Sequence, residues 1–168
     1  AYGETKSEAE RICAECRKPE NGGLVVCVLR PKTFIGTGRL GVFQILYDWV
    51  EDGKRIPAIG SGHNRYQLLE VLDLVDAAVL GLTVAPEAAN DVFTIGAERF
   101  GTADKDSFVS IERAKSRLGW QPKFSNREAL IHAYDWYLEN KDKIPTGSGI
   151  THRIGWDQGI LKLLKKFS

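Results

Sequence analysis

A tyrosine and a lysine near the start of the chain, Tyr2 and Lys6, have the types and spacing for proton-transfer chemistry. Residues four apart lie on one face of a helix, about one turn from each other. An ammonium held beside a phenol lowers the pKa of the phenol, because the positive charge favours the phenolate. A phenolate in that position can act as a general base that removes a proton from an alcohol. The same spacing also fits two solvated side chains on an exposed helix, so the segments that follow decide between the two interpretations.

These segments predict a mixed α/β chain. Apolar residues recur at helical spacing from Ala9 to Cys16 and predict an amphipathic helix over 7–18. The run 24–29 is apolar and rich in β-branched residues, which predicts a strand buried on both faces of a parallel sheet. Further strands are expected at 54–62 and 92–95, a loop at 102–107, and helices from Asp73 to about 82, at 111–118, and after a capping box formed by Ser125 and Glu128.

A literal G-x-G-x-x-G run spans 36–41. In a dinucleotide-binding fingerprint the first glycine stands at the end of a strand, and an acidic residue closes the next strand. Here five residues, beginning with Pro31, separate the predicted strand from Gly36, and the next predicted strand has no closing acid. The run is therefore interpreted as a glycine-rich loop that lines a substrate cleft, with a phosphate-binding module as the alternative.

Composition limits the function classes. At 168 residues and 43% hydrophobic content, the chain can form one domain or one large domain with a small lobe. Its net charge of +1 gives no electrostatic argument for nucleic acid or an anionic membrane surface. No apolar run is long enough to cross a bilayer, and an odd count of three cysteines fits a reducing cytoplasm. The three histidines are scattered without metal-ligand spacing, so no metal site is predicted.

The order of the motifs resembles that of the extended short-chain dehydrogenases, the NAD-dependent nucleotide-sugar epimerase/dehydratase family. The segments that carry the resemblance stand in the order that the family shows: 2–10, 28–31, 35–38, 60–73, 95–97 and 118–122. The resemblance implies an α/β fold that is the C-terminal part of a Rossmann-like domain with its small substrate-binding lobe, without the N-terminal cofactor-binding half. Its parts would be the end of the Rossmann-like domain at 1–38, a mixed α/β substrate-binding part at 39–145, and a flexible break with an amphipathic C-terminal helix at 146–168.

The resemblance also implies a reaction and a cofactor. Tyr2 would move the hydroxyl proton, while Lys6 would lower the pKa of Tyr2 and hydrogen-bond the nicotinamide ribose. The backbone at Pro31 would pack near the nicotinamide. The cofactor would be NAD or NADP, and a hydride would pass between a carbinol carbon of the substrate and the nicotinamide.

On the substrate side, the resemblance implies a small molecule such as a nucleotide sugar, with steroid-like and other carbonyl substrates as alternatives. Thr33 would help to shape the sugar pocket. An arginine that contacts the diphosphate in many relatives falls at about Tyr66, whereas the arginine of this sequence is Arg65. The family also has a longer helical insertion where this chain is short, so a deletion is expected around 102–103.

Two alternatives to an active enzyme stay open. The chain could be a catalytically inert, truncated remnant that survives by forming a homo-oligomer, because a bare edge on the predicted strand 24–29 needs a partner. It could also be a binding module that uses the glycine loop for phosphate. We expect residues 1–168 alone not to bind NAD, since a dinucleotide needs a phosphate-cradling helix N-terminus; measurable binding would favour the binding module.

Overall fold

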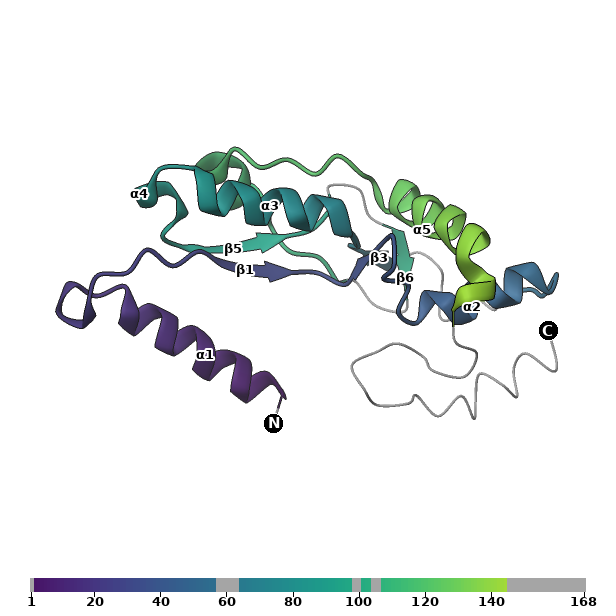
Figure 1. Ribbon diagram of the computed structural model, residues 1–168, viewed down its shortest axis with the longest axis horizontal. Helices are drawn as coiled ribbons and strands as arrows, with labels where there is room; N and C mark the ends of the chain where they lie inside the picture. Colours follow the sequence, from purple (N-terminus) through teal and green to yellow (C-terminus); the bar gives the residue numbers. More distant parts are fainter. Residues whose placement is uncertain (1, 57–63, 98–100, 104–106, 145–168) are drawn as a thin grey trace.

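The computed structural model describes residues 2–56, 64–97, 101–103 and 107–144 (Figure 1). Its α-helices are α1 (Tyr2–Cys16), α2 (Phe43–Glu51), α3 (Val71–Thr83), α4 (Pro86–Ala89) and α5 (Asn126–Asn140). Other helical segments are the 3₁₀ turns η1 (Pro19–Asn21) and η3 (Lys141–Lys143) and the π-helical η2 (Ala114–Leu118). The strands are β1 (Val28–Pro31), β2 (Phe34–Ile35), β3 (Asn64–Tyr66), β4 (Leu69–Glu70), β5 (Val92–Ile95) and β6 (Gly101–Ala103).

The strands of these ranges form two parallel pairs and one antiparallel pair. β1 pairs in parallel with β5, and β2 pairs in parallel with β4, whereas β3 and β6 are antiparallel. Figure 1 shows α3 and α1 on opposite sides of the β1–β5 pair, with α1 running against the direction of β1. The described residues therefore form a mixed α/β fold built around parallel strands, as the sequence predicts.

The prediction of a fully buried strand over 24–29 is wrong. The strand begins at Val28, and Leu24 and Val25 are each more than half exposed. β1 and β5 pair residue by residue from Val28 with Val92, so the length of β5 sets the length of β1. Within the described residues no strand lies on the other edge of β1, and its side chains range from half-buried to exposed. A run of β-branched residues thus becomes strand only where a partner strand supplies the hydrogen bonds.

The predicted helix near Asp73 is confirmed, but its cap is a different residue. Glu70 has an extended backbone, and its side chain accepts a hydrogen bond from the Leu72 N–H, so Glu70 is the N-cap of α3. Asp73 lies inside the first turn and is fully buried. Its carboxylate accepts hydrogen bonds from the backbone N–H groups of Lys123 and Phe124, at 3.0 and 3.2 Å. Asp73 thus joins α3 to the segment that leads into α5.

Other local signals are confirmed. The side chains and backbones of Ser125 and Glu128 form the reciprocal hydrogen bonds of a capping box at the start of α5. The helical segment before Gly119 ends there because this glycine adopts a left-handed conformation, with φ of 66°. β5 occupies the predicted range 92–95. A predicted loop at 102–107 is corrected in part, since β6 covers 101–103 and pairs with β3.

Two hydrophobic clusters hold the elements together. The first lies between α3, β5 and η2 and is formed by Leu69, Ala77, Phe93, Ile95, Ile111, Ala114, Leu118 and Trp120. The second lies between the glycine loop, α2 and α5 and is formed by Ile35, Leu40, Tyr47, Leu68, Ala129, Ala133 and Tyr137. β4 contributes to the first cluster while the residue before it, Leu68, contributes to the second, so the two cores meet at this strand.

Some predictions fall outside the described residues. The strand expected at 54–62 lies mostly on residues 57–63, and the break and helix at 146–168 lie wholly outside the described part of the chain. Among the helices that are described, none combines the length and the apolar character needed to cross a bilayer.

Candidate active site

Tyr2 and Lys6 lie on one face of α1, as their spacing predicts. The Lys6 Nζ atom is 5.8 Å from the centroid of the Tyr2 ring, a distance at which an ammonium is attracted to the face of an aromatic ring. Tyr2 is 77% exposed, so a ligand can reach its phenol. Figure 1 shows the N-terminal end of α1 on the side of the β1–β5 pair where the carboxyl ends of these two strands lie. Ligands of parallel α/β sheets bind at that edge.

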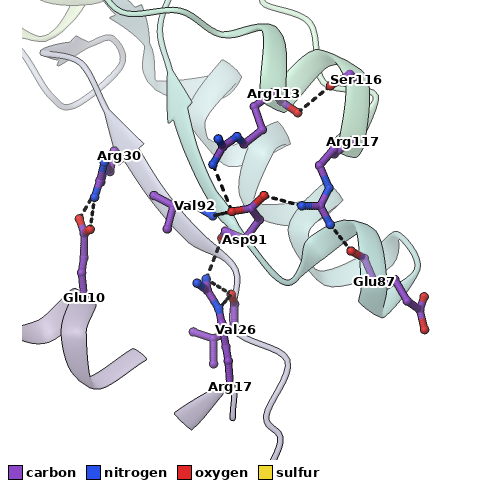
Figure 2. Close-up of polar contacts among 10 residues, drawn as sticks. All are labelled: Glu10, Arg17, Val26, Arg30, Glu87, Asp91, Val92, Arg113, Ser116 and Arg117. Carbon is purple, nitrogen blue, oxygen red and sulfur yellow. Dashed lines mark hydrogen bonds and ion pairs between the residues drawn. The ribbon is translucent and has the colours of Figure 1, made fainter. Parts of the chain in front are cut away.

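Polar contacts, and not burial, hold α1 against β1. No residue of α1 is buried. Figure 2 shows Glu10 accepting hydrogen bonds from the guanidinium of Arg30 in β1, with Arg30 Nε 2.8 Å from Glu10 Oε1. The hydrogen bond from Arg30 lowers the pKa of the Glu10 carboxyl. Because Glu10 follows Lys6 by four residues, this contact turns the helix face that carries Tyr2 and Lys6 towards β1.

A second contact secures the other end of α1. The Arg17 guanidinium donates to the carbonyl oxygen of Val26, from Nε at 3.1 Å and from Nη2 at 2.5 Å. Its Nη2 also donates to the carbonyl oxygen of Asp91, at 2.9 Å. Figure 2 shows that one arginine therefore ties the end of α1 both to the segment before β1 and to the start of β5.

The Asp91 side chain continues this network on the other side of β5. It accepts hydrogen bonds from the Val92 N–H at 2.7 Å, from Arg113 at 3.2 Å, and from Arg117 (Figure 2). Burial acts to raise the pKa of Asp91, but the Val92 N–H and the two guanidinium groups outweigh burial and hold this pKa below its ordinary value. Asp91 thus joins α1, β5 and η2 at one point.

Replacing Asp91 with asparagine is expected to lower the free energy of unfolding by about 1–2 kcal/mol at neutral pH, because two guanidinium groups lose their carboxylate. The folded-state pKa of Asp91 lies below the unfolded value of about 3.9, so its stabilisation is complete above that value and is lost as the pH falls through the lower folded-state pKa. Urea denaturation of wild type and D91N from about pH 7 to about pH 3 should show the difference shrinking in acid. The exposed Asp135 of α5 gives the control variant D135N, which should show no such difference.

On the substrate side, the structure brings together two of the three predicted residues. The hydroxyl groups of Thr33 and Tyr66 form a direct hydrogen bond, although the residues are 33 positions apart. Arg65 precedes Tyr66 in β3 and is exposed. Because side chains alternate along a strand, Arg65 projects from the face opposite to Tyr66. Pro31 is the last residue of β1, two positions before Thr33.

One residue near Thr33 and Tyr66, Lys32, belongs to none of the sequence motifs described above. Lys32 directly follows Pro31, and its Nζ atom donates to the Ser107 hydroxyl at 2.6 Å and lies 5.2 Å from the centroid of the Tyr66 ring. Only its position beside Pro31 could have indicated it from the sequence. Ser107 comes from a segment predicted as a plain loop, and a bridge to Tyr66 places it here.

The glycine loop folds as a tight turn. The N–H of Gly36 donates to the carbonyl of Arg39 at 3.1 Å, and the N–H of Arg39 donates back to the carbonyl of Gly36 at 2.9 Å. These two amide groups are therefore used within the turn, which disfavours the phosphate-binding module, since a phosphate needs N–H groups that point at the ligand. A Cβ at Gly36 would overlap the side chains of Glu70, at 2.4 Å, and Val71, at 2.6 Å, so the turn packs closely on the start of α3.

The opposite side of the loop borders a hollow. Residues of the loop line it together with residues of α2, α5 and the segment after η3: Gly38, Arg39, Leu40, Gly41, Gln44, Trp136 and Ile144. The role of the loop in lining a substrate cleft stays a prediction. In the described part of the chain, no group of three or more His, Cys, Asp or Glu side chains could hold a metal ion, and two of the three histidines, His63 and His152, lie outside that part.

A protein-family comparison matches more than half of the chain. Residues 1–96 match the NAD dependent epimerase/dehydratase family. The uncharacterized protein y4nG of Sinorhizobium fredii is 31% identical over 211 residues, which cover 97% of this chain and 52% of that protein. The aligned stretch of 211 residues exceeds the 168 residues of this chain, so the relative carries residues within it that this chain lacks.

Solved structures with the same fold include two enzymes bound to NAD. UDP-glucuronic acid 4-epimerase from Bacillus cereus superposes with a TM-score of 0.71 at 20% identity, over 86% of this chain and 53% of that one. dTDP-glucose 4,6-dehydratase from Bacillus anthracis superposes with a TM-score of 0.68 at 20% identity, over 84% of this chain and 53% of that one. The chain thus spans about half the length of the proteins that it matches.

Proposed function

Because the chain belongs to the NAD-dependent epimerase/dehydratase family, we propose that it is the substrate-side part of an enzyme that epimerises or dehydrates a nucleotide sugar. The observation that carries the proposal is the Lys6 ammonium beside the Tyr2 ring, on a helix face turned towards β1 by the Glu10–Arg30 contact. Tyr2 is exposed and is the first residue of α1, and the N-terminal end of this helix lies on the side of the carboxyl ends of β1 and β5, where substrates of parallel α/β sheets bind (Figure 1).

In this proposal Tyr2 takes the proton of a sugar hydroxyl, and the hydroxyl becomes a carbonyl. NAD, when bound, accepts the hydride that leaves the carbinol carbon. The Lys6 ammonium would hydrogen-bond the nicotinamide ribose. Pro31 would lie near the nicotinamide, and Thr33 with Tyr66 would line the sugar pocket; their direct hydrogen bond supports this pairing.

The described residues have the chemistry to contact the nicotinamide end of a dinucleotide but not its pyrophosphate. Tyr2 and Lys6 suit the nicotinamide end. A pyrophosphate binds at a glycine-rich turn that leads into a helix, where unpaired backbone N–H groups at the helix N-terminus point at the phosphates. The turn at 36–41 uses the N–H groups of Gly36 and Arg39 for its own hydrogen bonds, so it does not supply that cradle. The phosphate end of the cofactor therefore requires a part of the fold that the matched relatives have and this chain does not span.

We therefore expect residues 1–168 alone not to bind NAD. Titration of the purified chain with NAD, followed by tryptophan fluorescence, should give no saturable quenching. The control is the same titration of a longer protein in which this chain is joined to a cofactor-binding half, which should saturate. Saturable quenching in the isolated chain would show that these residues hold the dinucleotide by themselves, and would contradict this part of the proposal.

A catalytically inert fragment is the alternative, and one observation favours it. In the described residues, the second edge of β1 has no strand partner, and Leu24 and Val25 just before it are more than half exposed. Unpaired strand edges template association with other chains. A remnant of this kind would form oligomers, so light scattering that shows a strictly monomeric chain would count against it.

A further inference from the structure

The segment just after β1 carries a cation, Lys32, that forms no ion pair with any residue that the structure describes. Lys32 is half-buried at the carboxyl end of β1. Its Nζ atom donates to the Ser107 hydroxyl at 2.6 Å and lies 5.2 Å from the centroid of the Tyr66 ring. Around it, within the ranges that the structure describes, no carboxylate forms an ion pair with Lys32, whereas Lys18, Lys115, Lys123 and Lys141 all have such a partner.

The groups around this ammonium are held in place by the backbone. The Lys32 N–H donates to the carbonyl of Ile95 at 2.9 Å, which extends the β1–β5 pairing by one residue. The Ser107 N–H donates to the carbonyl of Arg65 at 2.7 Å, and the Ser107 carbonyl accepts from the Gln67 N–H at 3.0 Å. The cluster is thus held by backbone hydrogen bonds beside β1, β3 and β5, and strands position side chains more precisely than free loops do.

The chemistry of the cluster suits an anionic oxygen group. An ammonium has three donor hydrogens, and the hydrogen bond to Ser107 uses one of them. A partly desolvated cation without a counter-ion costs free energy that a bound anion would recover. The Ser107 hydroxyl accepts from Lys32 and can still donate its own hydrogen to the same anion, while Thr33 and Tyr66, which share one hydrogen bond, keep one further hydroxyl hydrogen between them.

We propose that Lys32, together with Ser107 and Tyr66, forms a subsite for an anionic oxygen group of the substrate, namely a carboxylate on the sugar. This inference rests on the proposed function, because that function places the sugar pocket at Thr33 and Tyr66, and Thr33 is the residue after Lys32. A diphosphate carries the same type of oxygen and is the other source of such a group. Lys32 would then be the residue that makes the enzyme prefer a uronic acid over a neutral sugar.

The test compares two nucleotide sugars that differ in this carboxylate. NMR titrations of the ¹⁵N-labelled 168-residue chain with UDP-glucuronic acid and with UDP-glucose detect weak binding and report on the amides of Lys32 and Ser107. In wild type, UDP-glucuronic acid should bind about tenfold more tightly, as expected for one charge-assisted hydrogen bond. K32M should lose this preference by weakening UDP-glucuronic acid alone, while K32R, which keeps the charge, should retain much of it.

The control variant is K18M, which removes the same charge from an exposed lysine that pairs with Glu15, and should keep the preference. If K32M weakens both ligands equally, the subsite takes the diphosphate and the carboxylate assignment is overturned. If both ligands bind and K32M changes neither affinity, the subsite is overturned while the proposed function stands. If wild type binds neither nucleotide sugar, the subsite is overturned, while the proposed function is tested separately by turnover in a protein that joins this chain to a cofactor-binding half. A K32M variant that does not fold is replaced by K32R and K32Q, and equal ligand preference in these two would also overturn the subsite.

Discussion

Replacing Tyr2 with phenylalanine is expected to lower kcat by about 10²–10⁴-fold in a protein that joins this chain to a cofactor-binding half. The substitution removes only the hydroxyl that would move the proton. The aromatic ring stays, and with it the contact to the Lys6 ammonium, 5.8 Å from the ring centroid. Substrate binding should therefore change little, so the loss should be in kcat and not in KM.

The measurement is steady-state turnover of a nucleotide sugar by wild type and Y2F. Tyr134 provides a matched control, because its hydroxyl donates to Glu51 at 2.7 Å, a contact between α5 and α2 that lies outside the proposed machinery. Y134F should keep nearly full kcat. A Y2F variant with kcat within a few-fold of wild type would remove Tyr2 from the chemistry, whatever the family of the chain.

Replacing Trp120 with alanine is expected to lower the free energy of unfolding by about 3–5 kcal/mol, the largest stability effect that we predict. Trp120 is 1% exposed in the first hydrophobic cluster. Its indole Nε1 donates to the carbonyl oxygen of Asp73 at 2.9 Å, so the substitution leaves both a cavity and a buried carbonyl without its donor.

Urea denaturation followed by circular dichroism measures this loss. Trp136 is only half-buried, at the margin of the second cluster, so W136A should cost clearly less. W120F should cost less than W120A, because a phenyl ring fills part of the cavity. A loss below about 1 kcal/mol for W120A would mean that the segment between η2 and α5 does not depend on this side chain.

The signals that predicted structure correctly are those that act within a few residues. Ser125 and Glu128 cap α5 through hydrogen bonds across three positions, and Gly119 ends η2 through its own backbone conformation. The spacing of Tyr2 and Lys6 fixes their common face in the same way. Such features are set by neighbouring residues, so they form independently of how the rest of the chain folds.

The features that escaped prediction depend on distant partners. The strand predicted over 24–29 begins only at Val28, where β5 supplies hydrogen bonds. Asp73 could not be told from Glu70 as the cap of α3, because its true partners, Lys123 and Phe124, follow about 50 residues later. In the candidate site, the pairing of Thr33 with Tyr66 and the contact of Lys32 with Ser107 likewise join segments that the fold alone brings together.

The central claim is that Tyr2 takes the proton of a sugar hydroxyl while a hydride leaves the carbon that carries this hydroxyl. A single-turnover experiment tests it most directly: a protein that joins this chain to a cofactor-binding half is mixed with NAD and a nucleotide sugar, and the absorbance of reduced nicotinamide is followed. We predict that reduced nicotinamide forms in wild type and that Y2F binds both ligands but forms it at least about a hundred times more slowly. Formation at the same rate in both proteins, or none in wild type with both ligands bound, would contradict the claim.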